Sequence, residues 1–263
     1  MKKHKHSFLA SRIMISSAGF TCLVFLAAIA WSSGASSQMQ GQRFQDRNVG
    51  LGAKGIKIKN RTKAFQVIGV ETSGQEVILN FRNDYDKNIT AFALSPVNHR
   101  YLLRVDLIDS DEVIAPQASY TKELTLPDSQ TDEATIIIRS VVFEDGTADG
   151  DLEISGRILD NRLGERVQMQ RVAELLNDAL KLPGPKLPKA FDSLKARIRD
   201  LPTDSDQPVS TYYRAGLHSA KENAIRHVES IEEHQPQALI NDLSQELRAM
   251  KDRYNVRIAK RTH

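Results

Sequence analysis

The stretch Val77-Ile78-Leu79-Asn80-Phe81-Arg82-Asn83 decides how the first half of the chain is interpreted. Its large apolar residues include Val77, Leu79 and Phe81, at every second position, which is the period of a strand with one face against a core. Turn-forming residues follow at Asn83-Asp84-Tyr85-Asp86. The pattern therefore predicts a half-buried strand that ends in a turn.

The same period of two recurs from Ile56 to about Glu144, with short turn signals between the apolar stretches. This spacing predicts an antiparallel β-sandwich of the immunoglobulin or fibronectin type III kind, without the Cys…Trp…Cys core of antibody domains. The other strands are expected around Phe65-Val67, Ile89-Ala91-Ala93, Leu103-Val105-Leu107, Leu124-Leu126 and Ile136-Ile138 with Val142.

After Asp151 the apolar period changes to 3.6, which predicts a helical C-terminal region and an α+β fold class. The first, long helix ends at Leu182-Pro183-Gly184-Pro185, and three more follow it. Its apolar stripe is expected at Ile154, Ile158, Leu163, Val167, Val172, Leu175 and Ala179. The stripes of the others are expected at Phe191 to Leu201, Tyr213 to Ile231 and Leu239 to Ile258.

The N-terminus carries a membrane-targeting pattern, with a basic head before an apolar run at 13–31. Residues 1–37 are therefore predicted to be a signal peptide or a signal anchor. Ala35 and Ser37 suit the −3 and −1 positions of a cleavage site. The alternative is an uncleaved anchor in the inner membrane, because the run approaches the roughly 20 residues that span a bilayer. Either way, the rest of the chain is expected to be periplasmic or extracellular.

Charge and cysteine content exclude several classes of function. Residues 1–37 hold four Lys and Arg side chains and no Asp or Glu, so removing them changes the formal charge from +3 to −1. The remaining chain lacks the net positive charge that would attract nucleic acid, so nucleic-acid binding is excluded. Membrane contact is expected only through the N-terminal segment. The sole cysteine, Cys22, lies in the apolar run, so the exported part has no thiol for catalysis or metal binding.

Composition suggests the domain boundaries. Residues 38–55, rich in Gly, Gln and charge, predict a flexible stalk. The sandwich and the first long helix are expected to form one unit over 56–182, because only a short acidic loop joins them. A Pro-rich hinge at 183–188 then precedes a separable helical tail at 189–263. The early apolar residues Ile154, Ile158 and Leu159 are expected to cover an open end or edge of the sandwich.

Two stretches, Val77 through Phe92 and Ser140-Val141-Val142-Phe143-Glu144-Asp145-Gly146, give the region 63–151 a resemblance to a known type of module. It resembles the immunoglobulin/fibronectin-like β-sandwich of uncharacterised exported bacterial proteins. The resemblance implies a bacterial, extracytoplasmic sandwich, and it implies no catalytic residues.

The acidic loop at 144–151 is the candidate metal site. Asp145 and Asp149 match calcium-ligating positions of an EF-hand loop, and Asp151 is a third carboxylate nearby. The match is incomplete, because Gly156 stands where a bidentate Glu is needed. The competing interpretation gives the Asp-Gly pairs turn roles and makes Asp151 the cap of the following helix.

Other possible catalytic residues have simpler explanations. Ser119 and Lys122 have the S-x-x-K spacing, but in a strand they point to opposite sides. His218 and Glu222, and His227 and His234, share helix faces without the H-E-x-x-H pattern of a metalloprotease. No catalytic residue and no cofactor is therefore predicted.

The sequence predicts a non-catalytic extracytoplasmic binding or scaffolding protein of unknown ligand. Its expected partner is an envelope protein or a second copy, contacted through the C-terminal helices, whose mixed charges resemble a coiled-coil flank. The alternative is a hydrolase whose site combines the acidic loop with a helical histidine, because residues distant in sequence can converge in a fold.

Overall fold

The computed structural model describes one unit of the chain, which lies within Phe44–His263. The predicted targeting segment, and the stalk up to residue 46, lie outside the described residues. None of the described helices combines the length and the apolarity needed to cross a bilayer. The described residues are 47–51, 56–73, 75–96, 102–110, 112–126, 134–181, 187–204, 208–234 and 240–261.

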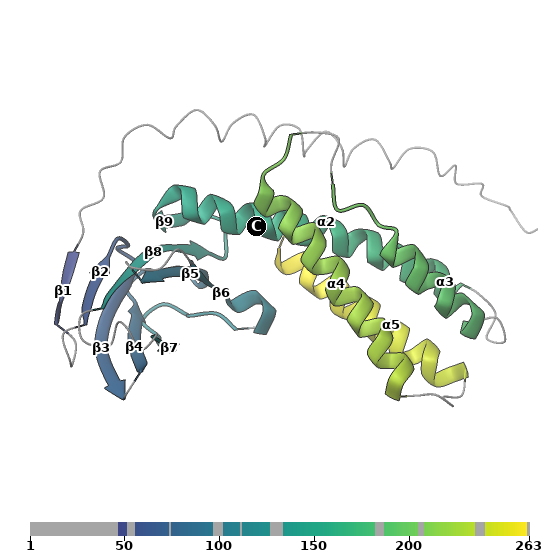
Figure 1. Ribbon diagram of the computed structural model, residues 1–263, viewed down its shortest axis with the longest axis horizontal. Coiled ribbons are helices and arrows are strands. Elements are labelled where there is room, and N and C mark those ends of the chain that lie inside the picture. The colour runs from purple at the N-terminus through teal and green to yellow at the C-terminus, as the bar shows by residue number, and fades with distance from the viewer. Residues whose placement is uncertain are drawn as a thin grey trace, which may run out of the picture. The chain divides into compact units, whose positions relative to one another are not determined.

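The strands form two sheets (Figure 1). All strand pairs are antiparallel except β2 with β8, which run parallel. The second sheet has the order β3 (Phe65–Ser73), β4 (Glu76–Asn83), β7 (Ser119–Thr125). The first has the order β1 (Arg47–Leu51), β2 (Lys57–Asn60), β8 (Thr135–Phe143), β5 (Ile89–Pro96), β6 (Leu103–Asp106), with β9 (Ala148–Gly150) also paired to β8.

One hydrophobic core contains side chains from both sheets, which we call together the β region. The ring of Phe65 on β3 stacks on Phe81 of β4, with centroids 4.9 Å apart, and meets Phe92 of β5 edge-on at 5.3 Å. Such contacts add to the free energy of burying the rings themselves. The α+β class predicted from the sequence is confirmed.

Burial along β4 alternates as the sequence predicted, with Val77, Leu79 and Phe81 inside. Strand β5 is different, because Ile89 to Leu94 are all buried. Its second face, with Ala91 and Ala93, packs against Ile154 and Ile158 of the first long helix. That helix was expected to cover an end or edge of the sandwich, and it instead covers the outer face of the first sheet.

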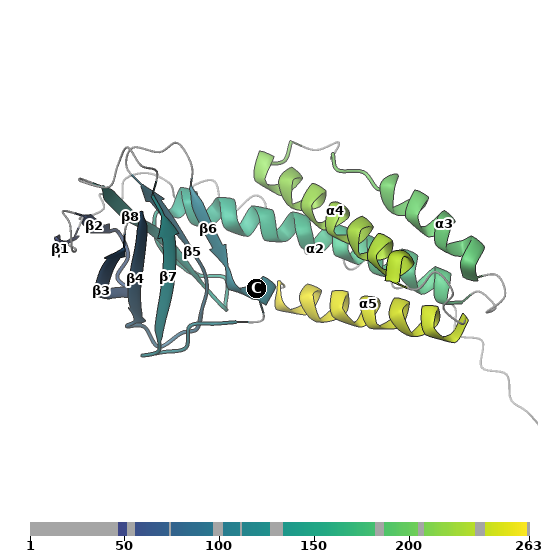
Figure 2. The same cartoon turned by 60° about the horizontal axis from the view of Figure 1, so that its bottom comes forward.

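The four helices share a second hydrophobic core. The longest helix, α2, contacts each of the other three (Figure 2). Asp151 caps α2 by accepting a hydrogen bond from the backbone N–H of Ile154. The structure thus joins the predicted tail at 189–263 to α2, which also contacts the β region. The helices are α2 (Leu152–Leu180), α3 (Leu187–Arg199), α4 (Thr211–His234) and α5 (Ile240–Lys260).

Two glycines let α2 and α4 approach closely. A Cβ added at Gly164 of α2 would lie 2.0 Å from the carbonyl oxygen of Tyr213, and one at Gly216 of α4 would lie 2.1 Å from that of Asn161. Both distances are far below van der Waals contact. The contact between these helices therefore requires glycine at both positions.

Two further features differ from the sequence predictions. Strand β1 lies inside the stretch 38–55 that composition assigned to a stalk, and it pairs with β2. In α2, Leu163 of the predicted stripe is 37% exposed, whereas the polar residues Asn161, Arg162 and Glu165 are buried. The middle of α2 therefore turns a polar face inward.

Candidate functional site: a buried ion-pair network

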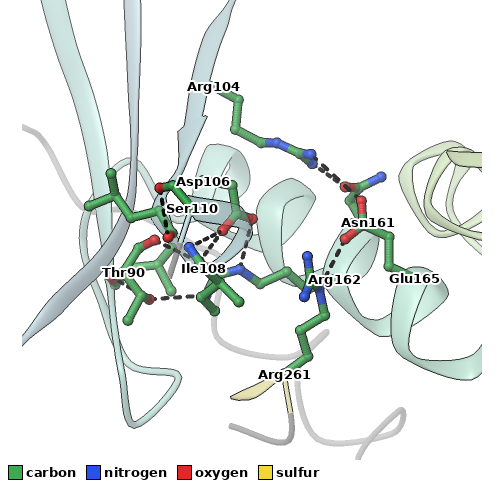
Figure 3. A network of polar contacts seen from close by, with 11 residues as sticks. Thr90, Arg104, Asp106, Ile108, Ser110, Asn161, Arg162, Glu165 and Arg261 are labelled. Atoms are coloured by element: carbon green, nitrogen blue, oxygen red, sulfur yellow. Dashed lines mark hydrogen bonds and ion pairs between the residues drawn. The ribbon is translucent and has the colours of Figure 1, made fainter. Parts of the chain in front are cut away.

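The polar face of α2 meets charged side chains from the β region and from the end of α5 (Figure 3). We call this group the arginine junction. It comprises Arg104 and Asp106 on β6, Arg162 and Glu165 on α2, and Arg261 just after α5. Its members come from three segments that are far apart in the sequence, so the fold brings these segments together.

Arg162 lies at the centre of the junction. Its Nε and Nη2 donate to the two carboxylate oxygens of Asp106 at 3.0 and 2.9 Å, which is the bidentate geometry that suits a guanidinium. Nη1 and Nη2 also donate to the hydroxyl and the carbonyl of Thr90 on β5, at 3.1 and 2.9 Å. The side chains of Arg162 and Asp106 are only 3% and 5% exposed. This pair therefore fixes α2 against two strands.

A second pair extends the junction to the C-terminal helix. Arg261 Nε donates to Glu165 Oε2 at 3.0 Å, and both side chains are buried. Arg104 lies 3.9 Å from the other oxygen of Glu165 and donates to the side-chain oxygen of Asn161. The Asn161 amide in turn donates to the backbone carbonyl of Tyr212 on α4, at 3.2 Å. The junction thus touches β5, β6, α2, α4 and the end of α5.

Electrostatics keep Asp106 ionised. Burial by itself raises the pKa of its carboxyl, but the hydrogen bonds and charge of Arg162, with the charges of Arg261 and Arg104, lower the pKa below its ordinary value. A general acid or base needs a pKa near the working pH, so Asp106 is unsuited to either task at neutral pH. The arrangement suits a fixed structural tie.

A cavity of about 450 Å³ lies beside the junction, and its lining includes Thr90, which accepts hydrogen bonds from Arg162. Two of its three acidic lining residues are bound by protein groups: Glu144 accepts from Asn88 at 2.8 Å, and Asp145 pairs with Lys87 at 2.7 Å. The complete lining is Thr90, Ile108, Glu112, Val113, Glu144, Asp145 and Lys260.

Asp145, the first of the predicted calcium ligands, is held within its own turn and by Lys87. It accepts hydrogen bonds from the backbone and the hydroxyl of Thr147 and from Lys87 Nζ. The hydrogen bond from Lys87, followed by that from Thr147, lowers the pKa of Asp145 to about 2. The carboxylate is therefore occupied by protein donors.

The other two predicted ligands serve other contacts. Asp149 accepts from the backbone N–H groups of residues 63–64 at 2.5 and 2.8 Å. Asp151 caps Ile154 and pairs with Arg139 at 2.7 Å, which confirms its predicted capping role. Across the described ranges no group of three or more His, Cys, Asp or Glu side chains is placed to hold a metal. The geometry lends no support to the calcium interpretation.

The remaining candidates also stay apart. Ser119 is exposed while Lys122 is half-buried, as expected for opposite sides of a strand. His218 is exposed, and the ring of His227 contacts Arg253 at 2.6 Å. Burial, then the charges of Arg253 and Arg257, lowers the pKa of His227. In the described part of the chain no hydrogen bond joins a helical histidine to the acidic loop.

The junction was not predicted from the sequence, although the spacing of residues along α2 carried a sign of it. The buried positions of α2 run through Ile158, Arg162, Glu165, Met169 and Val172, at helical spacing. A stripe drawn from apolar residues alone includes Leu163, which is exposed, and omits Arg162 and Glu165, which are buried. Charged residues at the expected positions of a buried stripe were the available sign of an internal ion pair.

No protein-family model, curated protein or solved structure matches the chain. The described geometry therefore defines its class: an α+β unit in which buried ion pairs join β6 of the first sheet to α2, and α2 to the end of α5.

Proposed function

We propose that the chain is a non-catalytic extracytoplasmic scaffolding or binding protein, in which the β region and the helices act as one rigid body. The observation that carries this proposal is the arginine junction. A buried ion pair contributes little net stability, because desolvation offsets the attraction, but it favours one arrangement of the elements that it joins. A fixed arrangement of two surfaces is what a scaffold requires.

The β region is proposed to be an immunoglobulin- or fibronectin-like sandwich from an exported bacterial protein. Its support is the face-to-face core of two sheets, with the orders β3-β4-β7 and β2-β8-β5-β6. In such folds one sheet contains strands A, B and E, and the other contains C, F and the last strand, G. The proposed counterparts are β3, β4 and β7 for A, B and E, and β5 and β8 for C and F. Here β2 takes the place of that last strand, parallel to β8.

Export is proposed to depend on residues 1–37, with the rest of the chain periplasmic or extracellular. Protease added to spheroplasts should degrade the full chain, and deleting 1–37 should make it resistant. N-terminal sequencing then separates a cleaved chain, starting at Gln38, from one anchored through 13–31. Equal protection of the full and the truncated chains would rule out export.

Binding can be tested with a photoreactive phenylalanine placed at exposed apolar positions of the full chain in its native cells. Ile68 and Val113 probe the β region, and Tyr212 and Val256 probe the helices; all four are at least 39% exposed. At least one position should give a discrete adduct, whose mass distinguishes an envelope protein from a second copy bound through the C-terminal helices. No discrete adduct at any position would contradict a binding role.

The absence of catalysis is tested on the same protein with generic ester, peptide and phosphate substrates. We expect no turnover that changes in Asp145→Asn or His218→Ala. Turnover lost in both variants would instead establish the hydrolase alternative, which no contact in the described structure favours.

A further inference from the structure

Strand β7 lies at an edge of the second sheet, where it pairs only with β4 among the described strands. The backbone N–H of Leu126 donates to Gln75, and the carbonyl of Ala118 accepts from Asn83, so even-numbered residues direct their backbone groups toward β4. Because these directions alternate along a strand, Thr121 and Glu123 direct theirs away from the sheet. An extended chain could pair with them.

An apolar cavity opens beside this edge, between β7 and the β5–β6 hairpin. Its volume is about 180 Å³, enough to admit an apolar side chain from outside. Both sheets contribute to it, so it marks the gap between their edges. Its lining is Leu94, Pro96, Leu103, Lys122, Glu123, Leu124, Thr125 and Leu126.

Lys122 adds a charge to the inner side of the same edge. It stands opposite Leu79 in the ladder, on the side of the strand that faces the core, and it is half-buried. No hydrogen bond or ion pair to another described residue satisfies its ammonium group. Inward-pointing lysines blunt sheet edges against indiscriminate pairing, and they equally select for a partner that brings a carboxylate.

We propose that β7 binds an extended peptide segment of another protein, which adds to the sheet as a new edge strand. This inference rests on the proposed binding function and names its ligand class. The residue opposite Lys122 points to the same inner face, and it is acidic. The residue two positions away, opposite Leu124, is apolar and enters the cavity. The ligand therefore carries an acidic and an apolar residue separated by one position.

A second copy of the chain fits this edge less well. Antiparallel pairing of two β7 strands in the fully overlapped register sets Lys122 directly against Lys122, and like charges in that position are destabilising. Shifting the register to avoid this contact shortens the pairing.

The test uses the full chain in detergent to select from a display library of random dodecamer peptides. Enriched peptides should share the acidic-x-apolar pattern, in either direction, and should lack proline beside it. Lys122→Glu should switch the selected acidic residue to Lys or Arg. Glu123→Pro removes the outward N–H while leaving the β4 ladder intact, and it should weaken binding about tenfold, whereas Glu123→Ala keeps the N–H and should bind normally.

A thermal unfolding transition shows whether each variant folds. If Glu123→Pro does not fold, the change of peptide preference in Lys122→Glu still decides the test. Peptides that bind wild type and all variants equally would overturn the β7 site while leaving a binding function elsewhere. If no peptide is enriched, the β7 site is also overturned. The crosslinking experiment then tests the binding function separately. Dimerisation that Lys122→Glu alters without peptide would identify a second copy as the occupant.

Discussion

The β region and helix α2 bury their side chains by different rules. The core between the sheets is built from apolar side chains, such as Phe81 and Leu79, whereas the middle of α2 buries Asn161, Arg162 and Glu165. An apolar core tolerates changes of similar volume, but a buried charge depends on the particular groups that it pairs with. The two regions should therefore differ sharply in their response to substitution.

The largest effect is expected from Arg162→Met, which leaves Asp106 buried without its bidentate partner. The free energy of unfolding, measured in urea, should fall by about 3–5 kcal/mol. Adding Asp106→Leu should recover most of that loss, because the stranded charge is removed. A loss below about 1 kcal/mol in the single variant would show that the junction is not a tie.

Gly164→Ala should come next, because its new Cβ meets the Tyr213 carbonyl and forces α2 and α4 apart. Overpacking of this kind costs about 1–3 kcal/mol. Gly156→Ala on the same helix is the matched control: its Cβ meets nothing within 4 Å, so it should stabilise by about 0.5–1 kcal/mol. Equal melting temperatures for the two variants would contradict the close helix contact.

Asp151→Ala should have a smaller effect at the point where the β region passes into α2. It removes the helix cap on Ile154 and the pair with Arg139, at a cost of about 0.5–2 kcal/mol. Asp151→Asn keeps a capping oxygen and should therefore lose only part of this stability. Urea unfolding distinguishes the three proteins, and identical midpoints would argue against the cap.

The smallest effect is expected from Asp145→Asn, on the exposed acidic loop. The pKa of Asp145 is lowered from 3.8 to about 2, so its contribution to stability is present above pH 3.8 and is lost as the pH falls through about 2. The exposed pair with Lys87 should contribute less to stability than any of the buried contacts above, and salt should weaken it. Thermal melts from pH 2 to 7 test this. Stabilisation of wild type, but not of Asp145→Asn, by added calcium would revive the metal interpretation.

Prediction from sequence succeeded where burial follows the apolar period. Strands around Val77-Phe81 and the stripes of α3 and α4 met that condition. The pairing of β1 with β2 escaped detection, because Arg47–Leu51 has no alternating pattern and draws its stability from a neighbouring strand. The junction was missed because an internal ion pair joins residues whose proximity only the tertiary fold establishes.

The separations within the junction bear on the order of folding. Arg162 lies 56 residues from Asp106 and 72 from Thr90, and Arg261 lies 96 from Glu165. Closing such long loops costs chain entropy that local helices and hairpins do not incur. The junction should therefore form after the sheets and α2, late on the folding path. Its loss should speed unfolding and leave the folding rate nearly unchanged.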